Sequence, residues 1–234
     1  MGARAFQTGT MNATERRARC DALPGYFKGR HVYELATSVR RFTSFVELGA
    51  FLGQSTCHLA QLLLERKRAR NLAFELDVVD AWATSTRWVR DPASVSAIAL
   101  HGGARNAWAA HMAATSSLGA VRSVTRAWAT DAVGRFANQS VDFLYLDTEH
   151  TYEYTRAQLR AWGPAVRGWV CGDDYCRPGV RRAVEEVFGA KRVEYLGYEQ
   201  FCVATTGRLP SRPLARLASP RQRADPCCET RRHC

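Results

Sequence analysis

The sequence lacks the features that place a chain in or across a membrane. No apolar run in its 234 residues approaches the ~20 residues that a spanning helix needs. Residues 1–20 are polar and basic, with no apolar core segment, so we expect no secretory signal. The start Met1-Gly2-Ala3-Arg4-Ala5-Phe6 lacks the Ser or Thr of a myristoylation signal. We therefore expect a cytoplasmic protein with no membrane partner.

The sequence also lacks a cysteine spacing typical of a zinc site. Of its eight cysteines, four lie at irregular spacing inside strongly patterned segments: Cys57, Cys171, Cys176 and Cys202. We expect these four to be buried free thiols in a reducing compartment. Cys227, Cys228 and Cys234 lie with His233 in a basic tail. That group could bind a metal, but a tail without fixed structure is the simpler interpretation.

Acidic residues are scarce relative to basic ones, 22 against 33, which gives a net charge of +11. A basic balance can indicate nucleic acid or an acidic substrate as the partner. Much of the excess is arginine at the two ends of the chain, which favours solvated termini over an RNA-binding arm. Nucleic acid is therefore the less favoured partner, and the oligomeric state stays open between a monomer and a homo-oligomer.

Hydrophobic periodicity predicts an α/β domain. Apolar strand patterns occur at residues 45–48, 74–79, 121–124, 141–146 and 169–171, and a hairpin at residues 192–205. Helical patterns lie between them, at residues 32–39, 55–64, 151–162 and 180–188. Alternating strands and helices predict a mostly parallel sheet with helices on both faces. Ligands of such sheets bind outside the carboxyl ends of the strands.

The pattern divides the chain into three parts. Residues 1–30 form a basic N-terminal extension, residues 31–206 form the domain, and residues 207–234 form a tail rich in Arg, Pro and Cys that we expect to be disordered. Within the domain, residues 83–118 are long for a connection. We expect this insertion to contain a lid-like helix and a helix that packs on the sheet.

The first strand runs into a glycine-containing loop that is suited to a cofactor. Gly49 and Gly53 let the backbone turn sharply and approach a ligand closely. Ser55 or Thr56 could cap the following helix, whose amino end favours a carboxylate. Asp80 ends the second strand, where it could accept hydrogen bonds from ribose hydroxyls. An ordinary strand–helix turn with glycines for packing is the alternative interpretation.

Acidic residues end the fourth and fifth strands. Asp147 follows residues 141–146, and Asp173 and Asp174 follow residues 169–171, with no lysine or arginine evident among them. Carboxylates that converge repel unless a cation lies between them, and oxygen ligands suit Mg²⁺. A metal lowers the pKa of a bound hydroxyl, and His150 could take its proton. The alternative is that the acids cap helices and His150 is an ordinary loop histidine.

These motifs resemble those of class I S-adenosylmethionine-dependent methyltransferases. Residues 45–56, which read Phe-Val-Glu-Leu-Gly-Ala-Phe-Leu-Gly-Gln-Ser-Thr, resemble the first motif of that family, and Val79-Asp80-Ala81-Trp82 the second. The resemblance implies a Rossmann-like fold with a seven-stranded sheet whose last strand is antiparallel. It also implies cofactor contacts from Glu47, Gly49, Gly53, Ser55 and Asp80. Where relatives often have a small polar residue near adenine, this chain reads Arg126-Ala127-Trp128-Ala129, so we expect adenine recognition to rest on Trp128 or on backbone groups.

The acids and the histidine resemble those of metal-dependent O-methyltransferases that act on sugars of natural products, and catechol O-methyltransferases have a similar acidic set. This resemblance implies Asp147, Asp173 and Asp174 as metal ligands, with Asp147 and His150 as catalytic residues. We therefore expect Mg²⁺-assisted O-methylation of a small hydroxylated acceptor such as a sugar. An RNA methyltransferase and a non-catalytic cofactor-binding module are the alternatives.

Overall fold

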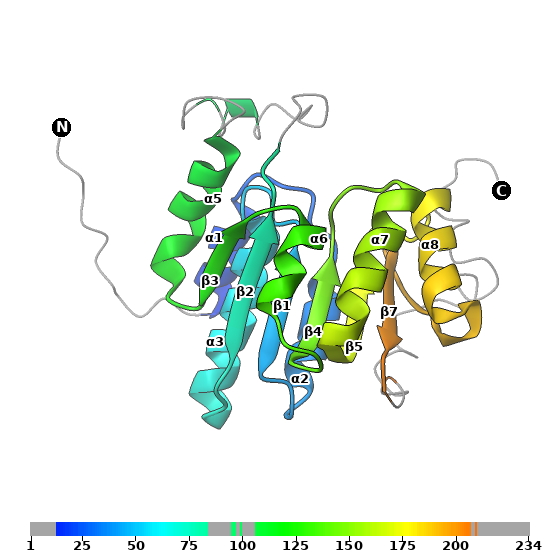
Figure 1. The fold of residues 1–234 in the computed structure, drawn as a ribbon. Coiled ribbons are helices and arrows are strands. Elements are labelled where there is room, and N and C mark those ends of the chain that lie inside the picture. The colour runs from blue at the N-terminus through cyan, green and yellow to red at the C-terminus, as the bar shows by residue number, and fades with distance from the viewer. Residues whose placement is uncertain (1–12, 84–94, 97–98, 100–105, 207–208, 210–234) are drawn as a thin grey trace.

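A seven-stranded sheet forms the centre of the molecule (Figure 1). The computed structural model describes residues 13–83, 95–96, 99, 106–206 and 209. The strand order is β3-β2-β1-β4-β5-β7-β6, and β7 runs antiparallel to both neighbours while β1 to β5 are parallel. The strands are β1 (Ser44–Leu48), β2 (Glu75–Asp80), β3 (Ser123–Arg126), β4 (Val141–Leu146), β5 (Val166–Gly172), β6 (Glu194–Gly197) and β7 (Gln200–Ala204). The predicted fold class is confirmed, including the antiparallel last strand.

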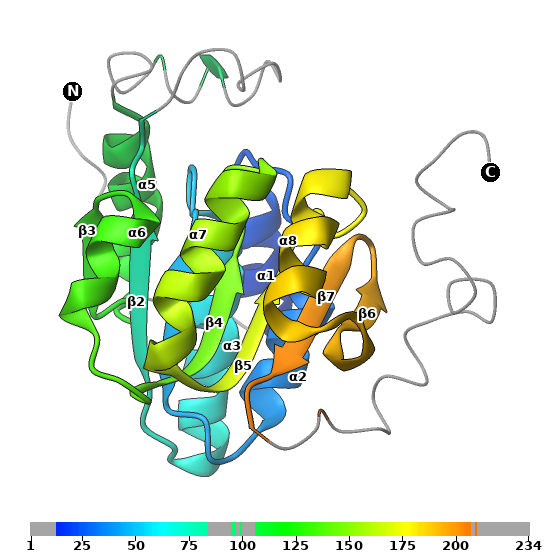
Figure 2. The same cartoon turned by 45° about the vertical axis from the view of Figure 1, so that its right-hand side comes forward.

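Helices cover both faces of the sheet, as Figure 2 shows. One face is covered by α6 (Ala129–Ala132), α7 (Tyr152–Trp162) and α8 (Pro178–Phe188). The other is covered by α1 (Ala13–Asp21), α2 (Arg30–Ser38) and α3 (Gln54–Arg70), and α5 (Ala107–Thr115) also contacts α3. Strand side chains alternate between the two cores: Phe45 and Phe143 pack with α2 and α3, whereas Val46 and Leu144 pack with α7 and α8. This alternation explains why the strands are apolar throughout.

The predicted boundary at residue 31 does not separate an extension from the domain. Helix α1 packs against α3, and a disulfide joins Cys20 to Cys57 across the two helices. The segment between α1 and α2, residues 22–29, also belongs to the domain, because the Phe27 ring packs 4.8 Å from the Tyr33 ring. Charge and composition alone do not reveal that such a basic segment carries the apolar residues that dock it.

The prediction of free thiols was wrong. Cys57 bonds to Cys20, Cys171 bonds to Cys202, and Cys176 is disulfide-bonded as well, so no described cysteine is free. Cys171 and Cys202 are direct neighbours in the β5–β7 register, which brings their side chains together. Paired cysteines are typical of oxidising compartments. The thiol argument for a cytoplasmic location therefore fails, and the location stays a prediction.

Several predicted segments fall outside the described residues. Helix α5 lies in the predicted insertion at residues 83–118, of which residues 84–105 are mostly not described, so the lid-like helix stays a prediction. The tail cluster Cys227, Cys228, His233 and Cys234 also lies outside them. Among the described helices, none is long and apolar enough to cross a membrane.

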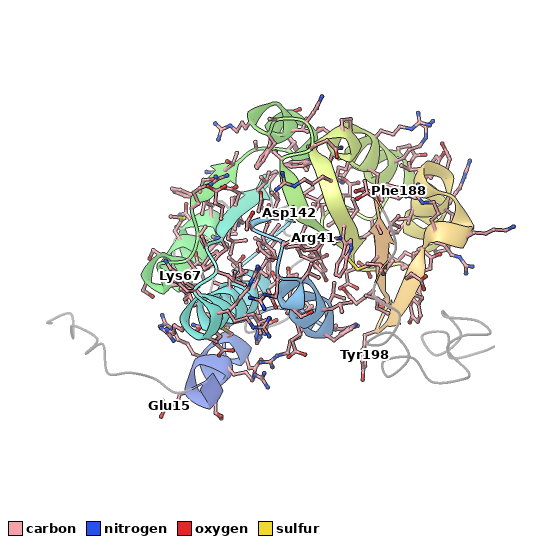
Figure 3. The ribbon with its side chains drawn as sticks, turned by 90° about the horizontal axis from the view of Figure 1, so that it is seen from below. Glu15, Arg41, Lys67, Asp142, Phe188 and Tyr198 are labelled. Carbon is pink, nitrogen blue, oxygen red and sulfur yellow. A yellow bond between two sulfur atoms is a disulfide. The ribbon has the colours of Figure 1, made fainter. Side chains whose placement is uncertain are left out.

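The amino ends of the strands, seen from below in Figure 3, are held by a buried acid. The Asp142 carboxylate accepts hydrogen bonds from the backbone N–H of Thr43, at 2.7 Å, and of Ser44, at 3.1 Å. Arg167 pairs with the same carboxylate at 2.7 Å. Asp142 therefore has a structural role that ties β1, β4 and β5 together at the end opposite the carboxyl ends.

Candidate functional site

Two adjoining cavities open at the carboxyl ends of the parallel strands. Figure 1 shows these strand ends at the upper edge of the sheet. The first has a volume of 440 Å³ and the second 470 Å³. Both are lined by Gly49, Phe51, Asp80, Asp147 and His150. Residues from the ends of β1, β2 and β4 thus form a wall common to the two cavities, so a ligand in one would meet a ligand in the other at this wall.

The loop after β1 is shaped by two glycines in the left-handed region. Gly49 has φ +84°, and a side chain there would collide with the Asp147 carbonyl oxygen of the neighbouring strand end. Gly53 has φ +94° and is the N-cap of α3, which has no side-chain cap. The prediction that Ser55 or Thr56 caps this helix was wrong, because both lie inside α3. Only glycine combines this backbone conformation with so close an approach.

Asp80 fixes the loop from the end of β2. Its Oδ2 accepts hydrogen bonds from the backbone N–H of Ala50, at 2.8 Å, and of Phe51, at 2.9 Å. Its Oδ1 accepts one from Trp82 N–H at 2.7 Å. Burial raises the pKa of Asp80, although these three donors oppose the rise. Asp80 therefore lines both cavities and also holds the loop in place.

Glu47 lies inside the domain rather than at a cavity. It is fully buried and lines neither cavity. Tyr33 donates a hydrogen bond to its Oε1 at 2.9 Å, and Thr56 donates one to Oε2. Burial raises the pKa of Glu47 to about 7, the charge of Asp147 adds to the rise, and hydrogen bonds from Ser55, Thr56 and Tyr33 oppose it. Glu47 thus links β1 to α2 and α3 beneath the loop.

The three remaining predicted cofactor contacts, Ser55, Gly53 and Trp128, do not share one location. Ser55 lines the second cavity, and Gly53 lines neither. Trp128 lines the first cavity, with 47% of the residue exposed. Its ring stands perpendicular to the Tyr154 ring, with centroids 5.8 Å apart, and Tyr154 lines the same cavity. The two rings form an aromatic corner that sequence analysis found only in part.

The predicted acids and the histidine do converge at the second cavity. His150 Nε2 lies 2.6 Å from Asp174 Oδ2 and 3.8 Å from Asp147 Oδ1. Potential ligand atoms of Asp147, His150 and Asp174 all lie within 4.8 Å of one another, as do those of Asp173, Asp174 and Glu199. Asp174 belongs to both sets, so the three predicted ligands fall into two overlapping groups rather than one.

The charges at this end are only partly balanced. Burial raises the pKa of Asp173 to about 8, and the charge of Asp147 adds to the rise. Burial acts in the same direction on Asp174, but His150 and Arg177 outweigh it and lower the pKa of Asp174. Burial alone would lower the pKa of His150, yet Asp147 and Asp174 raise it to about 9. The two carboxylates thus favour the protonated form of His150 in this arrangement.

The prediction that no cation lies among the acids was wrong. Arg177 Nε lies 2.9 Å from Asp174 Oδ1, and Lys28 Nζ lies 3.6 Å from Glu199 Oε2. Gln200 donates a hydrogen bond to Asp173 Oδ1 at 2.6 Å. Arg177 is close to the acids in sequence, so its position was within reach of sequence analysis. Lys28, Glu199 and Gln200 come from distant segments, and no sequence signal marks them.

Comparison with known proteins assigns the family. Residues 46–175, more than half of the chain, match a family model described as "Methyltransferase domain". The chain belongs to this family. The matched residues contain the loop after β1, the Asp80 strand end and all three predicted acidic ligands. No curated protein matches this methyltransferase.

Solved structures confirm that the methyltransferase has the Rossmann-like class I fold. A protein from Corynebacterium glutamicum is 15% identical with a TM-score of 0.54, over 86% of this chain and 93% of that one. The O-methyltransferase NovP is 20% identical with a TM-score of 0.53, over 76% and 78% of the two chains. Cofactor-bound Rv0187 from MTB is 15% identical with a TM-score of 0.51, over 82% and 87%. Identities this low establish the fold alone.

Proposed function

We propose that this methyltransferase transfers a methyl group from S-adenosylmethionine to a hydroxyl of a small acceptor such as a sugar. The observation that carries the proposal is the pair of adjoining cavities with their common wall of Gly49, Asp80, Asp147 and His150. A donor in the first cavity and an acceptor hydroxyl in the second would meet beside Asp147 and His150. That NovP is an O-methyltransferase of the same fold supports the reaction class.

The first cavity suits the nucleoside part of the cofactor. Gly49 lines this cavity, and its lack of a side chain lets the loop lie directly against the Asp147 carbonyl at the cavity wall. Asp80 can accept hydrogen bonds from ribose hydroxyls at the cavity wall, and the Trp128–Tyr154 corner offers aromatic faces to adenine. Ser55 would lie near the methionine end. Glu47 and Gly53 act by fixing the loop, since neither lines a cavity.

The acidic set fits Mg²⁺. Asp147, Asp173 and Asp174 offer hard oxygen donors, and Asp174 has potential ligand atoms near those of Asp147 on one side and of Asp173 on the other. Burial, with the charge of Asp147, raises the pKa of Asp173. We propose that these three residues hold the ion. Bound there, it would lower the pKa of an acceptor hydroxyl.

His150 would act as the base only when its own pKa falls. Asp147 and Asp174 raise that pKa, so any cation that neutralises the two carboxylates lowers it towards the usual value near 6.5. A neutral His150 at the common wall can then accept the hydroxyl proton. The base and the acids are thus one unit in this proposal.

The test is methyl transfer from isotopically labelled S-adenosylmethionine to pools of sugars, catechols and RNA, with Mg²⁺ and after exhaustive chelation. We expect labelled product from a hydroxylated small molecule, and little of it without the cation. Full activity after chelation would remove the metal from the proposal, and labelling of RNA alone would replace the acceptor class. Binding of the cofactor without transfer to any pool would favour the non-catalytic alternative.

A further inference from the structure

The second cavity has a cation on each side of its acids. Lys28, from the segment between α1 and α2, pairs with Glu199, and Arg177, the N-cap of α8, pairs with Asp174. Carboxylate oxygens of Asp174 and Glu199 lie within 4.8 Å of each other. The four charged groups therefore form a row, Lys28–Glu199–Asp174–Arg177, and all four line the cavity.

Both cations are more than half exposed at the rim of the cavity. The Lys28 side chain is 58% exposed and that of Arg177 is 53% exposed. The Arg177 ion pair is made through Nε. Exposed ion pairs contribute at most about 1 kcal/mol, so a ligand can replace these partners at little cost. Planar guanidinium groups match the oxygens of carboxylates and phosphates.

Lys28 is held at the cavity by its segment. Gln54 of α3 accepts a hydrogen bond from Phe27 N–H at 3.0 Å and donates one to the Leu23 carbonyl at 2.9 Å. Gly25 packs so closely that a side chain there would lie 2.7 Å from Gln54 Oε1. The Cys20–Cys57 disulfide anchors the start of the same segment. These contacts fix the backbone that leads to Lys28 against α3, so the Lys28 side chain extends from a fixed position at the cavity.

We infer that Lys28 and Arg177 recognise an anionic group, a carboxylate or a phosphate, on the acceptor. The inference rests on the proposed function, since it assigns the second cavity to the acceptor. The hydroxyl to be methylated would lie at the Asp147–His150 wall, and the anionic group would lie at the cationic rim. The acceptor is then an acidic hydroxylated molecule, such as a sugar phosphate or a hydroxy acid, rather than a neutral sugar.

Calorimetric titration of inorganic phosphate and of acetate tests this inference. The protein is first saturated with S-adenosylhomocysteine, and chloride keeps the ionic strength constant so that general screening does not change. We expect saturable binding of at least one anion. Lys28→Met should weaken it about tenfold, the effect of losing one charge-assisted contact. Lys67→Met is the matched control, because Lys67 lies ~20 Å from Gln54 along α3, at the end seen in Figure 3.

A second variant tests the guanidinium. Arg177→Lys keeps a positive charge beside Asp174 but removes the planar fork, and should weaken phosphate binding about fivefold. If phosphate binds and acetate does not, the anionic group of the acceptor is a phosphate ester. If both bind, the site also accepts a carboxylate. Absence of saturable binding, or equal affinity in Lys28→Met, would overturn the inference. Failure of S-adenosylhomocysteine to bind would instead contradict the proposed function.

Discussion

The two cavities differ in how completely their polar groups are satisfied. At the first cavity, three backbone N–H groups donate hydrogen bonds to the Asp80 carboxylate, and the loop glycines Gly49 and Gly53 have positive φ angles. At the second cavity, Asp173 and Asp174 are neighbours in sequence with opposite pKa shifts. One end is therefore preorganised by the backbone, and the other keeps unbalanced charge.

This difference shows which end the fold completes by itself. Backbone hydrogen bonds fix a loop whether or not a ligand is present, so the first cavity gains little order from its ligand. Crowded carboxylates store repulsion that only a cation or a proton relieves. In the structure Arg177, and His150 when it is protonated, lie against Asp174 and give part of that relief. Variants at the two ends should therefore separate stability from turnover.

The largest effect is expected at Asp174, which belongs to both groups of potential ligands. Asp174→Asn should reduce turnover by on the order of 10²–10⁴, the range for a lost catalytic contribution, while S-adenosylhomocysteine affinity stays the same. Asn tolerates the φ of +59° at this position, so the backbone need not change. Glu199 belongs to only one of the two groups, so Glu199→Gln is the control and should reduce turnover less than tenfold. Equal losses in the two variants would contradict a shared role for Asp174.

The next largest effect concerns the contribution of the Cys20–Cys57 disulfide to stability. Losing the Cys20–Cys57 disulfide should cost about 4 kcal/mol of unfolding free energy, because it closes a loop with a sequence separation of 37. The measurement is urea unfolding of the Cys20→Ser, Cys57→Ser double variant. Cys171→Ser, Cys202→Ser is the matched pair, with a separation of 31 and a similar expected cost. An unchanged unfolding midpoint in the first pair would show that α1 docks without the disulfide.

The site residues at the ends of the parallel strands could be predicted from the sequence, and they make up most of the candidate site. Asp80 is the last residue of β2, and Gly49, Asp147 and Asp173 directly follow β1, β4 and β5. The carboxyl ends of these parallel strands meet at one edge. Periodicity therefore placed these residues together without any knowledge of contacts. Glu47 precedes the strand end and points into the core, which a motif alone does not distinguish from pointing at a ligand.

The residues that reach the site from the antiparallel strands or from distant segments of the chain could not be predicted from the sequence. Glu199 reaches the acids from the β6–β7 turn, where it has a φ of +66°, because β7 returns antiparallel to β5. Lys28 arrives through a segment outside any periodic pattern. Cys171 and Cys202 pair because of the β5–β7 register, and spacing along a sequence does not encode which strands are neighbours. These three misses are thus tertiary neighbours, whereas the wrong helix cap at Ser55 or Thr56 was a local error.

Asp80 tests the preorganised end. Asp80→Ala leaves three backbone N–H groups without their acceptor, and should cost about 3–4 kcal/mol of unfolding free energy. It should also weaken S-adenosylhomocysteine binding, since the loop loses its anchor. Asp80→Asn keeps one carbonyl oxygen, so we expect roughly half the loss of stability. Urea unfolding and calorimetry give the two values. Weaker binding with unchanged stability would reduce Asp80 to a ligand contact alone.

The smallest effect concerns Glu47, whose pKa changes from 4.5 to about 7 on folding because it is buried. The folded state holds the proton more tightly, so the unfolding free energy falls as pH rises through the window from 4.5 to 7. The full change is about 3 kcal/mol.

The variant Glu47→Gln tests this prediction because its side chain stays neutral. Its unfolding free energy, measured relative to that of the wild type, should rise with pH across this window and stay constant above it. The exposed Glu194→Gln is the control and should follow the wild type at every pH. Urea unfolding at a series of pH values measures the difference, and a difference that does not change with pH would mean that Glu47 is ionised in the fold and stabilised there by Tyr33 and Thr56.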